Sequence, residues 1–294
     1  MAFEIVPYCV DLAEAAVASH SRTFGDIPFC WPVAADALAE PTTLTCSNLT
    51  TLRNDLVLAA LACGRVVGYV HAAVEDPKPA TDQQWGDYAV PQGVLRMFWY
   101  ERGERAAGEA LLQAAEGHLR RQGLERIEVM HCKRGYPWHG LPHAHLTQRA
   151  AHLHALLYLR GYVRETSSVS LAWRDAVKAP MASCSVAHTM RREDEPRPGG
   201  TSRVLLYAEQ SEVFAGMCVG GPLAEFAPDA PEAREWGYIH WLTVAEPFRR
   251  RGLAQTLLTA MFGELRREGL RHIALCCIEE NAPALLLYAN MGFS

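Results

Sequence analysis

The chain has 294 residues, a mass of 32.5 kDa and a hydrophobic content of 49%. This length and composition supply cores for two domains and exclude an intrinsically disordered chain. Lys and Arg number 28 against 33 Asp and Glu, and the net charge is −5. A general basic field that would attract nucleic acid or an anionic membrane is therefore excluded, and any anion site must be local.

The nine cysteines form no Cys-x-x-Cys pair, and most lie in apolar runs such as that around Cys276 and Cys277. Their odd number and the absence of a signal-like N-terminus favour free thiols in a reducing compartment. No apolar run approaches the ~20 residues that a membrane-spanning helix needs. We therefore expect a cytoplasmic protein that does not enter a membrane.

In chain order, the first clear elements are a hairpin at residues 57–69, a helix at residues 111–123 that ends at Gly123, and a buried strand at residues 126–130. The same order returns in residues 204–216, 257–269 and 272–276. Because 257 minus 111 and 269 minus 123 both give 146, we interpret the chain as a duplicated domain.

Proline and glycine interrupt any regular element between residues 176 and 200, which places the predicted boundary there. We predict two α/β (α+β) domains, residues 1–178 and 179–294. Each is expected to have a mixed, mostly antiparallel central sheet flanked by helices.

The first copy carries a long insertion between Met130 and Leu153 that is rich in histidine and aromatic residues. Its spacing matches no standard metal-ligand pattern, so we expect no metal. Such a loop suits acceptor recognition or an interdomain element. Its prominent side chains are His131, Tyr136, Trp138, His139, His143, His145 and His152.

In the second copy, an Arg-rich loop at residues 249–254 lies between a strand-like run ending at Val244 and a helix-like run starting near Gln255. Small residues at Gly252 and Ala254 leave backbone amides free to surround an anion at the start of the helix. This arrangement is typical of a pyrophosphate site.

This loop, with the strand at residues 241–244 and a downstream series of Asn281, Ala284, Tyr288 and Gly292-Phe293, resembles the GNAT superfamily of acetyl-CoA-dependent N-acetyltransferases. The loop pattern R-x-x-G-x-A alone is short, but the ordered combination is specific. The resemblance implies acetyl-CoA as cosubstrate, with the splayed strand pairing with the pantetheine arm. It assigns cofactor contacts to Leu242, Val244, Arg249, Arg250, Arg251, Gly252, Leu253, Ala254 and Asn281.

Acyl transfer to an amine needs a group that protonates the leaving thiolate and one that accepts the amine proton. The resemblance assigns the first role to Tyr288, unless that side chain is only a core aromatic. For the second, period-two alternation places Tyr238, His240, Leu242 and Val244 on one face, which makes His240 a candidate base. Glu235 is the alternative, and a packed core residue is the more common role of a lone histidine on an apolar strand.

The first copy departs from this pattern. Gly103 and Ala106 stand where the second copy has Arg249 and Gly252, and Leu157 stands in the place of Tyr288. A shifted match, Arg105 with Gly108 and Ala110, restores the loop pattern but moves the helix start, and Tyr158 lies one position late, turned about 100° around the helix. We expect the first domain to be catalytically degenerate.

The sequence ends at Ser294, immediately after Gly292-Phe293, where the family continues into a final strand. The first copy has such a strand in residues 167–173. For the second copy, residues 182–187 are a candidate to fill the gap, and we expect its usual first helices to be absent. We therefore expect a trimmed or interlocked second domain.

The predicted function is transfer of an acetyl or related acyl group to a primary amine of a small molecule or peptide. The alternative is a non-catalytic acyl-CoA-binding regulator on the same fold; aminoacyl transfer from tRNA is a weaker one, because the chain is acidic. An acidic rim that would suit a cationic acceptor is one interpretation of Glu225, Asp229, Glu232 and Glu235, and a solvated loop is the other. The two copies favour a monomer with pseudo-dimeric domains.

Overall fold

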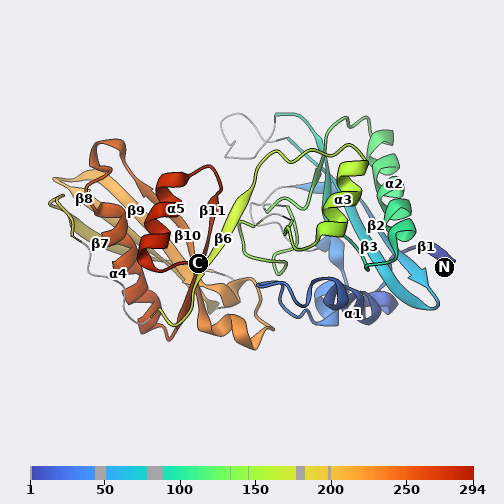
Figure 1. The fold of residues 1–294 in the computed structure, drawn as a ribbon, viewed down its shortest axis with the longest axis horizontal. Helices are drawn as coiled ribbons and strands as arrows, with labels where there is room; N and C mark the ends of the chain where they lie inside the picture. Colours follow the sequence, from blue (N-terminus) through green and yellow to red (C-terminus); the bar gives the residue numbers. More distant parts are fainter. Residues whose placement is uncertain are drawn as a thin grey trace. The chain divides into compact units, whose positions relative to one another are not determined.

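The computed structural model describes residues 2–43, 51–77, 89–132, 134–144, 146–176, 183–197 and 200–294. The chain divides into two compact units, Met1–Glu165 and Thr166–Ser294. Each unit has its own sheet and helices (Figure 1), so the predicted fold class is confirmed.

The first unit has a five-stranded sheet in the order β1-β2-β3-β4-β5, in which only the β4–β5 pair is parallel. Two helices take opposite faces: α2 packs where Gly68 meets Leu111, and α1 packs where Ser19 accepts the indole N–H of Trp99. The elements are β1 (Phe3–Pro7), η1 (Val10–Leu12), α1 (Ala13–Phe24), η2 (Ala35–Leu38), η3 (Pro41–Thr43), β2 (Leu52–Ala62), β3 (Arg65–Glu75), β4 (Gln92–Tyr100), α2 (Arg105–Arg121), β5 (Ile127–Val129) and α3 (Ala151–Leu159).

The second unit has a six-stranded sheet in the order β6-β11-β10-β9-β8-β7, and the β10–β11 pair is parallel. Its elements are β6 (Ser168–Trp173), β7 (Thr189–Pro196), β8 (Ser202–Gln210), β9 (Val213–Pro222), η6 (Leu223–Glu225), η7 (Pro231–Glu235), β10 (Trp236–Val244), η8 (Glu246–Phe248), α4 (Leu253–Arg267), β11 (His272–Ile278) and α5 (Ala282–Met291).

Helix α4 approaches its sheet closely because three strand positions under it are glycines. A Cβ atom at Gly216, Gly220 or Gly237 would lie 3.1, 2.7 or 2.8 Å from side chains of α4. The helix residues concerned are Leu257, Met261 and Leu265, which share one helix face and are all fully buried. We call this side of the sheet the α4 face.

The prediction that residues 167–173 close the sheet of the first domain is wrong. Strand β6 pairs with β11 along its whole length, from Trp173 opposite Ile273 to Ser168 opposite Ile278. The indole of Trp173 then packs 5.6 Å from the ring of Phe262 and 5.7 Å from that of Phe293, between ring centroids. Burying this aromatic group in the second core is the physical reason for the assignment.

The second unit therefore takes a strand from a part of the chain that precedes residue 190, as the interlocked interpretation requires. The competing candidate does not fill the gap: residues 183–187 form no strand, and Ala182 lies outside the described residues. Strands β7 and β8 pair with each other directly in sequence, whereas α1 lies between β1 and β2 in the first unit. The predicted loss of the first helices of the second copy is thus confirmed.

Candidate active site

Strands β10 and β11 separate partway along their length. Among the described residues they are paired only from Trp236 opposite His272 to Ile239 opposite Leu275, although β10 continues to Val244. The backbone edge of residues 240–244 is therefore open toward β11. An extended amide-rich chain could pair with such an edge as a further strand does.

A β-bulge lies where the strands begin to separate. Ile239 pairs with Gly220 and Trp241 with Val219, so His240 is the extra residue of β10. A bulge inverts the alternation of all residues beyond it. The prediction that His240 shares a face with Leu242 and Val244 is therefore wrong.

His240 lies on one face of the sheet, and Leu242 and Val244 lie on the other. Leu242 and Val244 pack against the core under α4. The ring of His240 instead lies 4.9 Å from that of Tyr238 and 5.7 Å from that of Phe226, between centroids, on the other side. His240 thus lies on the side of the sheet that α4 does not cover, where its ring is half-buried and its Nε2 atom is buried.

The Arg-rich loop has the conformation of an anion site. The Nε atom of Arg249 donates to the carbonyl of Val244 at 2.9 Å, which closes the loop on the end of β10. Arg250 and Gly252 are left-handed, with φ of 62° and 87°, and Gly252 is the residue at which α4 begins. In the described part of the chain, the amides of residues 251–254 donate no hydrogen bond to a protein acceptor. Four adjacent donors at a helix start can hold a pyrophosphate.

Gly252 has a second neighbour that the sequence did not reveal. A Cβ atom there would lie 2.0 Å from the carbonyl oxygen of Ser183. The amide of Ser185 donates to the carbonyl of Arg251 at 3.0 Å, so this segment is fixed on the loop. The close approach that requires glycine includes a protein segment, whereas the sequence suggested a ligand alone.

Helix α5 presents the two other predicted site residues. The side chain of Asn281 accepts the amide of Ala284 at 3.3 Å, which caps the helix as expected. Tyr288 is only 7% exposed and lies in the core shared with α4. Burial raises the pKa of its hydroxyl well above the usual value, and the thiols of Cys277 and Cys218 add to this. The group therefore keeps its proton at neutral pH.

The alternative base, Glu235, is engaged elsewhere. Its carboxylate lies 3.6 Å from a guanidinium nitrogen of Arg271 and 3.5 Å from the ring of His272. Glu235 also precedes β10 at the end far from the bulge. His240 is therefore the better placed of the two candidates.

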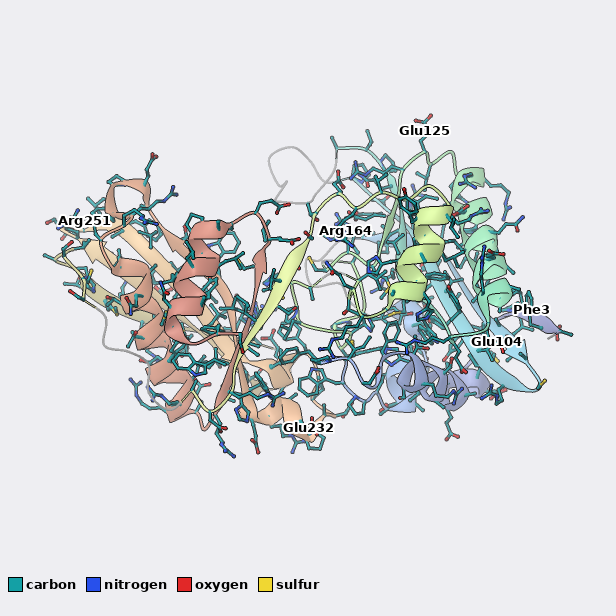
Figure 2. All side chains as sticks on the ribbon, viewed as in Figure 1. Phe3, Glu104, Glu125, Arg164, Glu232 and Arg251 are labelled. Atoms are coloured by element: carbon teal, nitrogen blue, oxygen red, sulfur yellow. The ribbon has the colours of Figure 1, made fainter. Side chains whose placement is uncertain are left out.

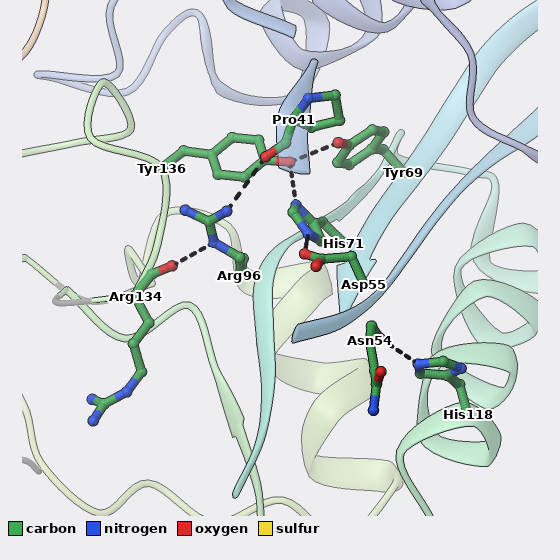
Figure 3. Close-up of polar contacts among 9 residues, drawn as sticks. All are labelled: Pro41, Asn54, Asp55, Tyr69, His71, Arg96, His118, Arg134 and Tyr136. Carbon is green, nitrogen blue, oxygen red and sulfur yellow. Dashed lines mark hydrogen bonds and ion pairs between the residues drawn. The ribbon is translucent and has the colours of Figure 1, made fainter. Parts of the chain in front are cut away.

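The first unit repeats the bulge with a different residue. Gly93 pairs with Ile127 as Gly237 pairs with Ile273, and the bulge residue, Arg96 here, again follows the glycine by three positions. Arg96 is buried, and its guanidinium donates to the carbonyls of Arg134 and Pro41 at 3.0 and 3.3 Å (Figure 3).

A chain of buried polar groups extends from this bulge in the first unit. Asp55, His71, Tyr136 and Tyr69 are joined in sequence at 2.7, 2.8 and 2.6 Å (Figure 3). Burial lowers the pKa of His71, so the ring stays neutral. Burial acts to raise the pKa of Asp55, but the hydrogen bond from His71 and the positive charge of Arg96 bring that pKa below its usual value. Through Tyr136, the long insertion thus packs on the sheet face of the first unit that is equivalent to the His240 face of the second unit.

The remaining equivalents in the first unit also lack the site's chemistry. Helix α2 begins after Glu104, a carboxylate where α4 has Gly252, and Figure 2 marks Glu104 and Arg251 at these two helix starts. Leu157 is buried in the place expected for a tyrosine, and Tyr158 is 79% exposed. The bulges and the polar chain carry no local sequence signal, because they depend on strand register.

His139 of the insertion packs against α1. The rings of His20 and His139 approach to 3.2 Å, and the side chains of Trp138 and Phe24 surround them. Among the described residues no group of three or more His, Cys, Asp or Glu side chains could hold a metal ion; His145 lies outside them. In the same part of the chain, no helix has the length and apolar character to span a membrane.

Comparison with known proteins gives matches to the second unit and to the whole fold. Residues 171–293 match the model of the acetyltransferase (GNAT) family. A stretch of 78 residues, 26% of the chain, is 33% identical to the N-alpha-acetyltransferase MAK3 of Arabidopsis thaliana, and it spans 40% of that protein's length.

Among solved structures, a tandem GNAT protein from the clavulanic acid biosynthesis pathway superposes with a TM-score of 0.67 and 15% identity, over 100% of this chain and 95% of that one. A GCN5-related N-acetyltransferase from Sphaerobacter thermophilus gives a TM-score of 0.63 and 17% identity, over 99% and 92%. At these identities the likeness shows the fold alone, and the family match covers only residues 171–293.

Proposed function

We propose that this chain, whose residues 171–293 belong to the acetyltransferase (GNAT) family, transfers an acetyl group from acetyl-CoA to a primary amine. The observation that carries the proposal is the combination of the open edge of β10 beyond Ile239 with the free amides of residues 251–254. The relative named as an N-alpha-acetyltransferase supports an amine acceptor.

Binding of the cosubstrate is assigned to main-chain groups. The amides of residues 251–254 would hold the pyrophosphate, with Arg250 available to its oxygens and Arg249 holding the loop on Val244. The edge of residues 240–244, including Leu242, would pair with the pantetheine arm, and Asn281 would contact the cosubstrate from the start of α5. These donors fit an anionic, amide-rich molecule.

Acyl transfer is assigned to direct attack of the amine in a ternary complex. His240, at the bulge on the face opposite α4, would accept the amine proton directly or through water. Tyr288, on the α4 face and protonated at neutral pH, would donate a proton to the leaving thiolate. The two groups act from opposite faces of the sheet, so proton removal and proton donation are separated.

The first unit is proposed as a degenerate copy that does not bind the cosubstrate. The carboxylate of Glu104 would repel an anion at the start of α2. The buried guanidinium of Arg96 is bound to the carbonyls of Arg134 and Pro41. For the whole chain we propose a cytoplasmic monomer, since two units in one chain replace the two subunits of a dimer.

Replacing Tyr288 by Phe tests the proposal against that of a non-catalytic acyl-CoA-binding protein. We expect kcat to fall about 100-fold with an unchanged Kd for CoA, since a general acid contributes roughly that factor or more. Because the raised pKa keeps the hydroxyl protonated, the ratio of wild-type to variant kcat should be the same at pH 7 and pH 9. An equal kcat for both proteins would leave Tyr288 a packing residue; binding of CoA without turnover of any amine would favour the regulator.

A further inference from the structure

Two large apolar side chains of the second unit are exposed where β10 and β11 separate. Trp241 is 57% exposed and follows the bulge residue His240 directly. Ile278 is 44% exposed and ends β11. Neighbouring exposed apolar side chains indicate a binding surface, whereas singly scattered ones do not.

Both side chains lie on the face opposite α4. On β10, Leu242 packs into the α4 core, so the alternation places Trp241 on the other side. On β11, Leu275 and Cys277 are in the same core, so Ile278 also projects to the other side. Trp241 and Ile278 therefore flank the open end of the gap on the face where His240 lies.

The acceptor must enter from this face. Helices α4 and α5 fill the α4 face with a continuous core that contains Tyr288. On the other face, the segment around η6 covers β10 as far as His240, whose ring contacts Phe226, and beyond the bulge Trp241 is exposed. An amine that reaches a thioester held between β10 and β11 therefore passes Trp241 and Ile278. The acceptors that bind favourably to Trp241 and Ile278 are therefore the amines that react.

Two of the four carboxylates of the predicted acidic rim are paired with arginines. The carboxylate of Glu225 is bound by Arg197 at 2.9 Å and by Arg203 at 2.6 Å, and Glu235 is paired with Arg271. The other two, Asp229 and Glu232, are exposed.

The turn after Ile278 is the nearest source of further negative charge. It adds Glu279, which accepts the hydroxyl of Ser167, and Glu280. Two exposed carboxylates therefore lie beside Ile278.

We infer that Trp241 and Ile278 form an apolar entrance to the acceptor site, and that the acceptor is a single amine on an apolar or aromatic skeleton. The inference rests on the proposed function and names its substrate class. Tryptophan holds an ammonium by cation–π attraction and a flat or aliphatic skeleton by burial of apolar area. A polyamine or a polyhydroxylated amine gains less from these surfaces.

The test measures binding and turnover with stated probes. Phenethylamine and n-hexylamine represent the inferred class, and spermidine and glucosamine represent polycations and amino sugars. Each is titrated into the CoA-bound protein and assayed for CoA release from acetyl-CoA. The variants are Trp241→Ala and Trp241→Phe, with Met190→Ala as a control, since Met190 is a 40% exposed apolar residue on the edge strand β7 of the same sheet.

We expect the wild type to bind the two monoamines at least about ten-fold more tightly than the other probes. Trp241→Ala should weaken monoamine binding about ten-fold and raise KM by the same factor. The Kd for CoA should change little, because residues 240–244 are assigned to CoA through their main chain. Trp241→Phe should keep most of the affinity, and Met190→Ala all of it.

Tighter binding of spermidine or glucosamine, binding of none of the probes, or equal monoamine affinity in Trp241→Ala would overturn the inference. Failure of the wild type to bind CoA would instead contradict the proposed function, so the two failures are distinguished. A loss of CoA affinity in Trp241→Ala would assign the side chain a structural role and also overturn the inference.

Discussion

Gly252 is constrained by its backbone and by its neighbour at the same time. Its φ of 87° disfavours any L side chain, and the carbonyl of Ser183 occupies the space that a Cβ atom would need. Gly269, at the other end of α4, has nearly the same φ of 85° but nothing within 4 Å of its Cβ position. The two glycines therefore separate the cost of conformation from the cost of contact.

We predict that Gly269→Ala lowers the free energy of unfolding by ~1 kcal/mol and that Gly252→Ala lowers it by at least ~2 kcal/mol, because only the second displaces a backbone carbonyl. Urea unfolding of both variants measures the difference. Amide exchange should also rise at residues 183–185 in Gly252→Ala alone. Equal losses of stability would mean that the segment at Ser183 does not rest on the loop in solution.

At the scale of single residues, the sequence predicts well what depends on near neighbours. Arg249 closing its loop and Asn281 capping its helix involve partners within five residues. The face of His240 was predicted wrongly, because the bulge arises from the pairing of β10 with β9 and has no signature in the sequence of β10. The same holds for Arg96 and the polar chain beside it, whose members come from distant parts of the chain.

Strand β6 shows the same limit at the scale of elements. Its β-prone sequence was recognised, but its partner was not, since residues 168–173 follow the first copy and pair with the last strand of the second. Hairpins and helices of both copies were predicted because their signals are local. The choice between two sheets depends on which core buries Trp173, and this cannot be read from alternation.

Proline substitutions test the position of β6. The amide of Ala172 donates to Ser294 on the outer side, so by alternation that of Leu171 points to β11. Leu171→Pro should cost about 3 kcal/mol and raise amide exchange in β11, whereas Ala172→Pro should cost less. Exchange that rises in β2 and β3 of the first unit would contradict the assignment of β6.

At the scale of the whole molecule, the two units are copies with different surfaces at the same places. The helix that follows the central strand begins at Gly252 with basic neighbours in one unit and at Glu104 in the other. The bulge carries His240 beside an exposed Trp241 in one and a buried Arg96 in the other. The central claim is therefore that one chain holds one cosubstrate site, in the second unit.

Calorimetric titration of the full chain with CoA tests this claim most directly, with matched variants in the first turns of the two helices, Ala254→Glu in α4 and Ala106→Glu in α2. A carboxylate there is compatible with folding, because it faces the positive end of the helix dipole, but it repels a pyrophosphate. We predict one CoA per chain, a Kd at least about ten-fold weaker in Ala254→Glu and an unchanged Kd in Ala106→Glu. Two CoA molecules per chain, or binding that only Ala106→Glu weakens, would contradict the account.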